Sequence, residues 1–232
     1  VAVTDKTLTD MTLRLDREAR REAASKGRSV AIRTPQGTVV VTPDMLAAAD
    51  DSLEVRIRGN DDGVRGAAGK LASSIGAAVL GDGRGLTIET NIPEAGWKAY
   101  APTRVTVPDG IALPDITAVV LLGADGSWTT VPWKPGADNE VEVYLPGGGS
   151  LIFLRDGKSF RDVDAEYWGK ASIEEAASSL LVMGRGDGTF DPDGRVTPVI
   201  SPITSSNGPA WSPDGRLMYY VDTRTRRVDV LY

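Results

Sequence analysis

The stretch of sequence that most constrains the fold is SFRDVDAEYWGKASIEEAASSLLVMGRGDGTFDPDGRVT, residues 159–197. Its apolar residues recur at helical spacing, which predicts a helix of about 15 residues after Asp164. The apolar stripe of this helix consists of Trp168, Ile173, Ala176, Ala177, Leu180 and Leu181. Glycines in MGRGDGTF then end the helix and return the chain to the core. We therefore expect Phe160, Trp168, Ile173 and Phe190 to be buried.

A second helix is expected to begin at Thr197, which is a good N-cap residue. The residues that follow, Pro198-Val199-Ile200-Ser201-Pro202, oppose a helix because they are β-branched and end in a second proline. We interpret residues 197–205 as the passage from one sequence pattern into another.

Residues 159–197 resemble the S-layer homology domain of bacterial cell-surface proteins. The matching positions are Phe160, Asp162, Val163, Trp168, Gly169, Ile173, Gly184, Gly186, Asp187, Gly188, Thr189, Phe190, Pro192, Asp193 and Thr197. The resemblance implies a noncatalytic protein of the cell wall or S-layer of a Gram-positive-type bacterium. Its partner would be a secondary cell-wall polymer attached to peptidoglycan, and the implied contacts are Asp162, Trp168 and Asp187.

The sequence departs from the family pattern at one position that matters for binding. The resemblance implies an arginine at the start of the second helix, which contacts acidic sugars, but Pro198 stands there. Anchoring would therefore depend on one incomplete repeat. Asp187, Asp191 and Asp193 do not form an EF-hand, because Pro192 and Pro198 occupy the positions that require Gly and Glu.

The last residues, SSNGPAWSPDGRLMYYVDTRTRRVDVLY (205–232), predict an antiparallel meander with strands at 209–211, 217–222 and 227–231. They resemble one propeller blade of the gluconolactonase/regucalcin family. That resemblance implies that Asn207 is a ligand of a divalent metal such as calcium or zinc. The other ligands of that family have no counterpart here. A fragment of a metal-dependent sugar-lactone hydrolase is therefore the alternative function, and the first interpretation needs no cofactor.

Residues 1–155 read as an α+β module, mostly β, with amphipathic helices. Helices are expected at 5–25 and 43–49 and in the alanine-rich stretch after residue 62; β segments at 29–34 and 38–42 form a hairpin. The strand at 52–58 alternates apolar and charged residues. Further strands are expected at 86–90, 100–107, 117–122, 127–131, 140–144 and 150–155. The chain is thus divided into 1–155, 159–197 and 205–232.

Composition excludes several functions. The chain has 232 residues, a net charge of −6, and neither cysteine nor histidine, so it has no thiolate or imidazole for catalysis or for binding zinc. An acidic chain has no general attraction to nucleic acid. No apolar run reaches the roughly 18 residues that a membrane span needs. The opening residues, VAVTDKTLTD, read as the interior of a longer chain.

Overall fold

The computed structural model describes residues 10–97, 101–182, 184, 187–190, 206–211, 218–222 and 227–231. The chain forms two compact units, Val1–Phe190 and Asp191–Tyr232. Antiparallel sheets dominate, with a few helices, as the sequence predicts for an α+β chain. The expected boundary between 155 and 159 lies inside the first unit and stays a prediction.

The strands of the first unit are β1 (Asp10–Leu15), β2 (Val30–Thr34), β3 (Gly37–Val41), β4 (Leu53–Gly59), β5 (Ala78–Val79), β6 (Leu86–Thr90), β7 (Ala101–Thr106), β8 (Ala118–Leu122), β9 (Trp128–Thr130), β10 (Trp133–Pro135), β11 (Glu140–Leu145) and β12 (Gly149–Arg155). Its α-helices are α1 (Arg17–Ser25), α2 (Pro43–Ala48), α3 (Asp62–Ile75) and α4 (Lys170–Ser178). Short 3₁₀ turns are η1 (Leu80–Gly83), η2 (Glu94–Trp97) and η3 (Leu113–Asp115).

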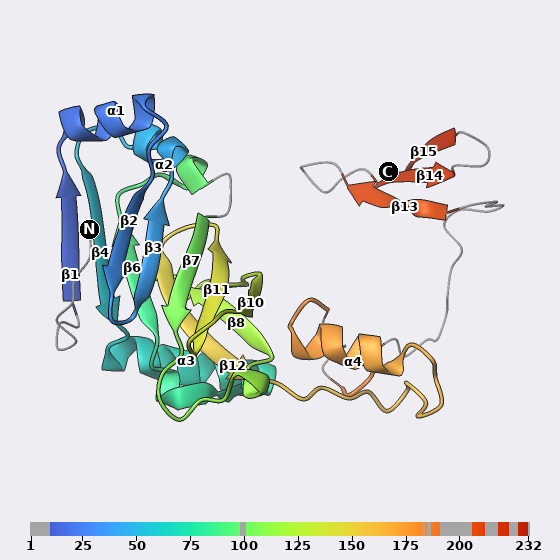
Figure 1. Cartoon of the computed structure of the whole chain (residues 1–232). Coiled ribbons are helices and arrows are strands. Elements are labelled where there is room, and N and C mark those ends of the chain that lie inside the picture. The colour runs from blue at the N-terminus through green and yellow to red at the C-terminus, as the bar shows by residue number, and fades with distance from the viewer. Residues whose placement is uncertain are drawn as a thin grey trace. The chain divides into compact units, whose positions relative to one another are not determined.

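Two sheets share one core. The larger runs β1-β4-β6-β12-β8-β9, with β5 also paired to β12, and the smaller runs β10-β11-β7-β3-β2. Figure 1 shows α1 and α2 at one end of these sheets and α3 at the other. Inward side chains of both sheets form a single apolar cluster, including Val39, Val143, Ile57 and Phe153. The hairpin predicted at 29–42 is confirmed as β2–β3.

Strands β8 and β12 are buried on both faces. All five residues of Ala118–Leu122 are buried, as are Ser150–Leu154. One face meets the smaller sheet, and on the other Val120, Ile152 and Leu154 pack against Ala68 and Leu71 of α3. Continuous apolar runs are typical of strands covered on both sides, which is why these two segments do not alternate.

Strand β4 shows the opposite pattern, because one of its faces meets solvent. Leu53, Val55 and Ile57 are buried, as their alternation predicts. The charged residues between them pair with neighbouring strands: Arg56 lies 2.5 Å from Asp10 of β1, and Arg58 lies 2.8 Å from Glu89 of β6. These exposed pairs keep the open face polar and contribute little to stability.

The helix predicted over residues 5–25 is wrong in its described first part. Residues Asp10–Leu15 form strand β1, which pairs with β4 from Asp10↔Arg58 to Leu15↔Leu53. Their alternating burial is that of a sheet edge, so strand pairing overrides the helical spacing. Asp16 then caps α1 by accepting a hydrogen bond from the Ala19 amide at 2.8 Å.

The second unit contains a three-stranded antiparallel sheet, β13 (Ser206–Trp211), β14 (Met218–Asp222) and β15 (Arg227–Leu231), in the order β13-β14-β15. The meander predicted at 205–232 is confirmed for these residues. The expected turn at Pro192 and the helix cap at Thr197 lie outside the described residues.

The Arg20 side chain of α1 donates hydrogen bonds to backbone carbonyls at and after the end of α2. It is 3% exposed, its Nε donates to the Asp51 carbonyl at 3.0 Å, and its Nη1 donates to the Leu46 carbonyl. The last carbonyls of a helix have no partners within it, so a guanidinium that reaches several of them satisfies groups that are otherwise buried and unpaired.

We expect Arg20→Ala to lower the free energy of unfolding by about 3 kcal/mol, because the buried Leu46 carbonyl and the part-buried Asp51 carbonyl lose this donor. Urea titration measures this change. Arg21→Ala, at the exposed neighbouring position, is the matched control and should stay within about 0.5 kcal/mol. Equal changes in the two variants would show that the hydrogen bonds of Arg20 add nothing measurable to the free energy of unfolding.

Candidate functional site

Two stretches of the segment 159–197, FRDV (160–163) and GDGTF (186–190), lie against each other. The Phe190 amide donates to Asp162 Oδ1 at 2.9 Å, and the Arg161 amide donates to the Gly188 carbonyl at 3.0 Å. The rings of Phe160 and Phe190 lie 5.2 Å apart. Phe160 is buried and Phe190 partly buried. FRDV and GDGTF are therefore held together by two hydrogen bonds from backbone amides and a contact between their phenylalanine rings.

Gly184 allows this closure. A Cβ at this position would lie 2.4 Å from the Phe160 ring and 2.6 Å from the Thr189 carbonyl oxygen. No L side chain fits there, so the glycine serves close approach of the backbone. The glycine spacing of the motif thus has a packing cause.

Asp187 holds the tip of the turn. Its Oδ1 accepts from the Thr189 amide at 3.0 Å and from the Thr189 hydroxyl at 2.6 Å. The bond from the Thr189 hydroxyl is the main cause that lowers the pKa of Asp187. Arg161 Nη2 lies 3.6 Å from Asp187 Oδ2. Asp162 and Asp187 therefore lie at the same turn, and one carboxylate oxygen of each accepts a hydrogen bond from a backbone amide.

Trp168 is 89% exposed, so the expectation that it is a core residue is wrong. The helix is shorter than predicted: α4 begins at Lys170, after Gly169, and Trp168 lies outside it. The indole therefore does not join the helical stripe. It lies 5.6 Å from the Tyr167 ring, centroid to centroid, and together they form an exposed aromatic pair.

The other end of α4 also departs from the predicted stripe. Leu180 has a φ of +57° and turns into the core, whereas Leu181 is exposed. Leu180 joins the cluster formed by α3, β8 and β12. Lys158 Nζ donates to the Ile75 carbonyl at the end of α3 and pairs with Asp156 at 2.9 Å. The two ends of the stretch 158–180 thus contact the N-terminal module, through Lys158 and Leu180.

The metal-ligand prediction for Asn207 is not tested, because only the backbone of this residue, in β13, is described. Among the described residues, no three Asp or Glu side chains gather as a metal site would require. No helix in the described part of the chain is long and apolar enough to cross a membrane. Sequence reasoning passed over Tyr167 and Arg161, although both lie next to matched positions.

Comparison with known families gives two matches. The S-layer homology domain matches residues 159–197, and the SMP-30/Gluconolactonase/LRE-like region matches residues 183–231. The two matched segments overlap at 183–197. No curated protein and no solved structure gives a significant match. The chain therefore carries both patterns that its sequence resembles, one running into the other, and the first of them points to attachment at the cell surface.

Asp162→Ala is expected to release the Phe190 amide, so that its protection from hydrogen exchange falls by about tenfold, equivalent to about 1.4 kcal/mol. Hydrogen exchange followed by NMR measures this at the single amide. Asp164→Ala is the matched control, because Asp164 accepts only from the nearby Glu166 amide among the bonds described for it. Unchanged protection of Phe190 in the Asp162 variant would contradict the closure.

The lowered pKa of Asp187 predicts an acid-sensitive turn. A depressed folded-state pKa contributes stability above the ordinary aspartate value, about 3.9, and that contribution is lost as the pH falls through the lowered pKa. Thr189→Val should raise the Asp187 pKa toward the ordinary value, measured by NMR titration of the carboxyl group. Thr129→Val, on strand β9, should leave it unchanged; a common shift in both variants would refute the assignment.

Proposed function

We propose that the chain is a noncatalytic, envelope-associated protein whose residues 159–197 hold a secondary cell-wall polymer by one incomplete S-layer homology repeat. The observation that supports this most directly is the closed FRDV–GDGTF turn, which leaves Trp168 exposed beside Tyr167. Exposed aromatic rings offer flat apolar faces, which suit the C–H faces of sugar rings.

The proposal assigns different roles to the three candidate residues. Trp168, which has the highest exposed fraction among the large apolar residues that the structure describes, contacts the polymer directly. Asp162 and Asp187 contribute chiefly by shaping the turn, since their bonded oxygens are occupied. Arg161, with a side chain 70% exposed, supplies positive charge for an acidic polymer in place of the arginine that Pro198 replaces.

The gluconolactonase-like match supports the second candidate function, a fragment of a metal-dependent lactone hydrolase. It rests on the match to residues 183–231 and on the three-stranded antiparallel sheet. In that function Asn207 would hold calcium or zinc. A single amide oxygen is too few ligands for a hard cation, so the matched segment would need additional ligands. Lactone hydrolysis that depends on added calcium or zinc would support this function over anchoring.

The anchoring proposal predicts that the chain sediments with purified cell-wall sacculi from a Gram-positive bacterium, and that Trp168→Ala weakens retention about tenfold, equivalent to about 1.4 kcal/mol. Arg161→Gln should weaken it further at low salt and less at high salt, because the charge contribution is screened. Retention is measured by quantifying bound and free protein over a range of sacculi concentrations.

Leu181→Ala is the matched control, because Leu181 is also an exposed apolar residue near α4. It should retain wild-type binding, whereas general hydrophobic adsorption would be weakened equally by both substitutions. Loss of retention after the wall polymer is removed from the sacculi with hydrofluoric acid would identify the polymer, not peptidoglycan, as the partner.

A further inference from the structure

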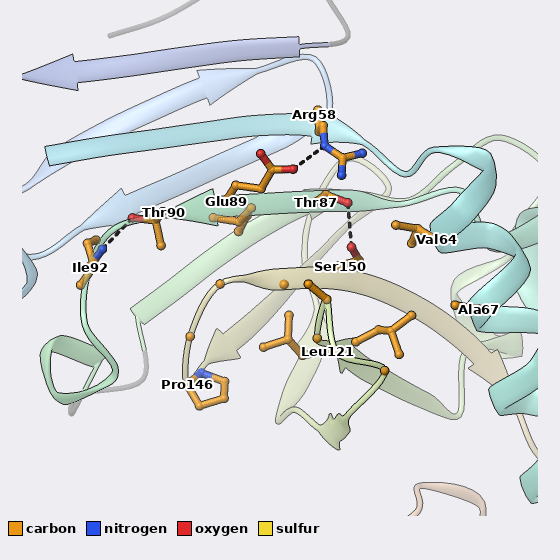
Figure 2. Close-up of a pocket in the computed structure, with 18 of the residues that line it drawn as sticks. Arg58, Val64, Ala67, Thr87, Glu89, Thr90, Ile92, Leu121, Pro146 and Ser150 are labelled. Atoms are coloured by element: carbon orange, nitrogen blue, oxygen red, sulfur yellow. Dashed lines mark hydrogen bonds and ion pairs between the residues drawn. The ribbon is translucent and has the colours of Figure 1, made fainter.

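A cleft of about 720 Å³ lies in the N-terminal module, and none of its lining residues belongs to the matched segments. Figure 2 shows it between β6, the start of α3 and the loops that precede β9 and β12. Its volume lies in the range of about 300–1,000 Å³ typical of small-molecule sites.

The cleft exists because β6 and β12 pair over only two positions, Thr87↔Ser150 and Ile88↔Gly149. Beyond them the chain turns through residues 146–148, which connect β11 to β12. A Cβ on Gly148 would lie 2.9 Å from the Ile88 carbonyl oxygen, and one on Gly149 would lie 2.9 Å from the Leu121 side chain. The chain therefore passes both strands at a distance that only glycine allows, and the wall of the cleft is bare backbone at these two positions.

A chain of hydrogen bonds determines whether the Ser150 hydroxyl, which lines this cleft, acts as a donor or as an acceptor. Asn60 Nδ2 donates to the carbonyls of Gly83 and Leu151, both at 2.9 Å, so its Oδ1 is the atom that accepts from the Thr87 hydroxyl at 2.8 Å. The single hydroxyl hydrogen of Thr87 is therefore used in the hydrogen bond to Asn60. Ser150, 2.8 Å from Thr87, must then donate to Thr87. Both lone pairs of the Ser150 oxygen are then available as acceptors.

The charges at the cleft cancel. Among its lining residues only Arg58 and Glu89 are charged, and they pair at 2.8 Å. Arg58 also pairs with Asp61 at 2.8 Å, and Glu89 with Arg56 at 3.2 Å. A charged ligand would have to break these pairs to gain a partner of its own. The cleft therefore favours a neutral ligand.

The walls are apolar around the Ser150 acceptor. Val64 and Ala67 of α3 flank one side, and Leu121 and Pro146 the other (Figure 2). A matching ligand is neutral and carries a hydrogen-bond donor next to a small apolar group. An acetamido group has this arrangement, because its N–H adjoins a carbonyl that bears a methyl group.

We propose that this cleft binds an N-acetylated amino sugar, with the acetamido N–H donating to Ser150 Oγ and the methyl group lying against Val64 and Ala67. The choice of a sugar among acetamido compounds rests on the proposed wall function, because wall glycan consists of such sugars. The site is a second carbohydrate contact, carried by the N-terminal module and independent of Trp168.

The test measures binding of the trimer of N-acetylglucosamine to the full chain by isothermal titration calorimetry, with cellotriose as the matched probe that lacks acetamido groups. We expect binding of the acetylated trimer and at least tenfold weaker binding of cellotriose. Ser150→Ala should weaken binding of the acetylated trimer about tenfold. Val64→Trp should abolish it by filling the cleft, without touching the hydrogen-bond chain.

Ser73→Ala is the control, because Ser73 lies on α3 but outside the lining and bonds only to the Gly69 carbonyl among the bonds described for it. Equal binding of both trimers would overturn the acetamido assignment. No binding of either trimer, or binding that survives in a folded Val64→Trp variant, would overturn the cleft as the site. The proposed anchoring function is tested by a different measurement, the effect of Trp168→Ala on retention by sacculi. Failure of the cleft proposal and failure of the proposed function are therefore distinguishable.

Discussion

Burial of β8 and β12 on both faces is the constraint on which the rest of the first unit depends. Alternate side chains of the same strands serve two cores: Val119 and Phe153 face the smaller sheet, whereas Val120 and Ile152 face α3. The second of these cores also receives Leu180. The loops at one end of these two strands line the cleft. One apolar layer thus supports both the segment that resembles an S-layer homology repeat and the cleft proposed as a sugar site.

Few contacts attach the S-layer-like segment to the layer formed by β8, β12 and α3. Burial of one leucine contributes about 1.5–3 kcal/mol, and Lys158 adds a hydrogen bond to the end of α3. The closed turn has its own supports in Asp162, Asp187 and Gly184. The segment is therefore a small folded element on a larger platform. An exposed aromatic pair at its surface needs such a platform, because a short helix is marginal alone.

Much of the fold follows from local pattern. The alternation of β4, the β2–β3 hairpin and the C-terminal meander are confirmed as predicted. The misses have a common cause. Residues Asp10–Leu15 satisfy both helical and alternating spacing, and only an available partner edge on β4 selects the strand. Trp168 was assigned to a stripe whose helix begins two residues later.

The sequence by itself determined the element types of most segments and the two family patterns, because these depend on spacing, caps and glycines within short distances. Only the tertiary structure decided that Trp168 faces solvent, that Leu180 docks on α3, and that Ser150 is an oriented acceptor in a cleft. Each of these depends on atoms brought together from distant segments. Ser150, for example, owes its polarity to Asn60, which lies 90 residues earlier in the sequence.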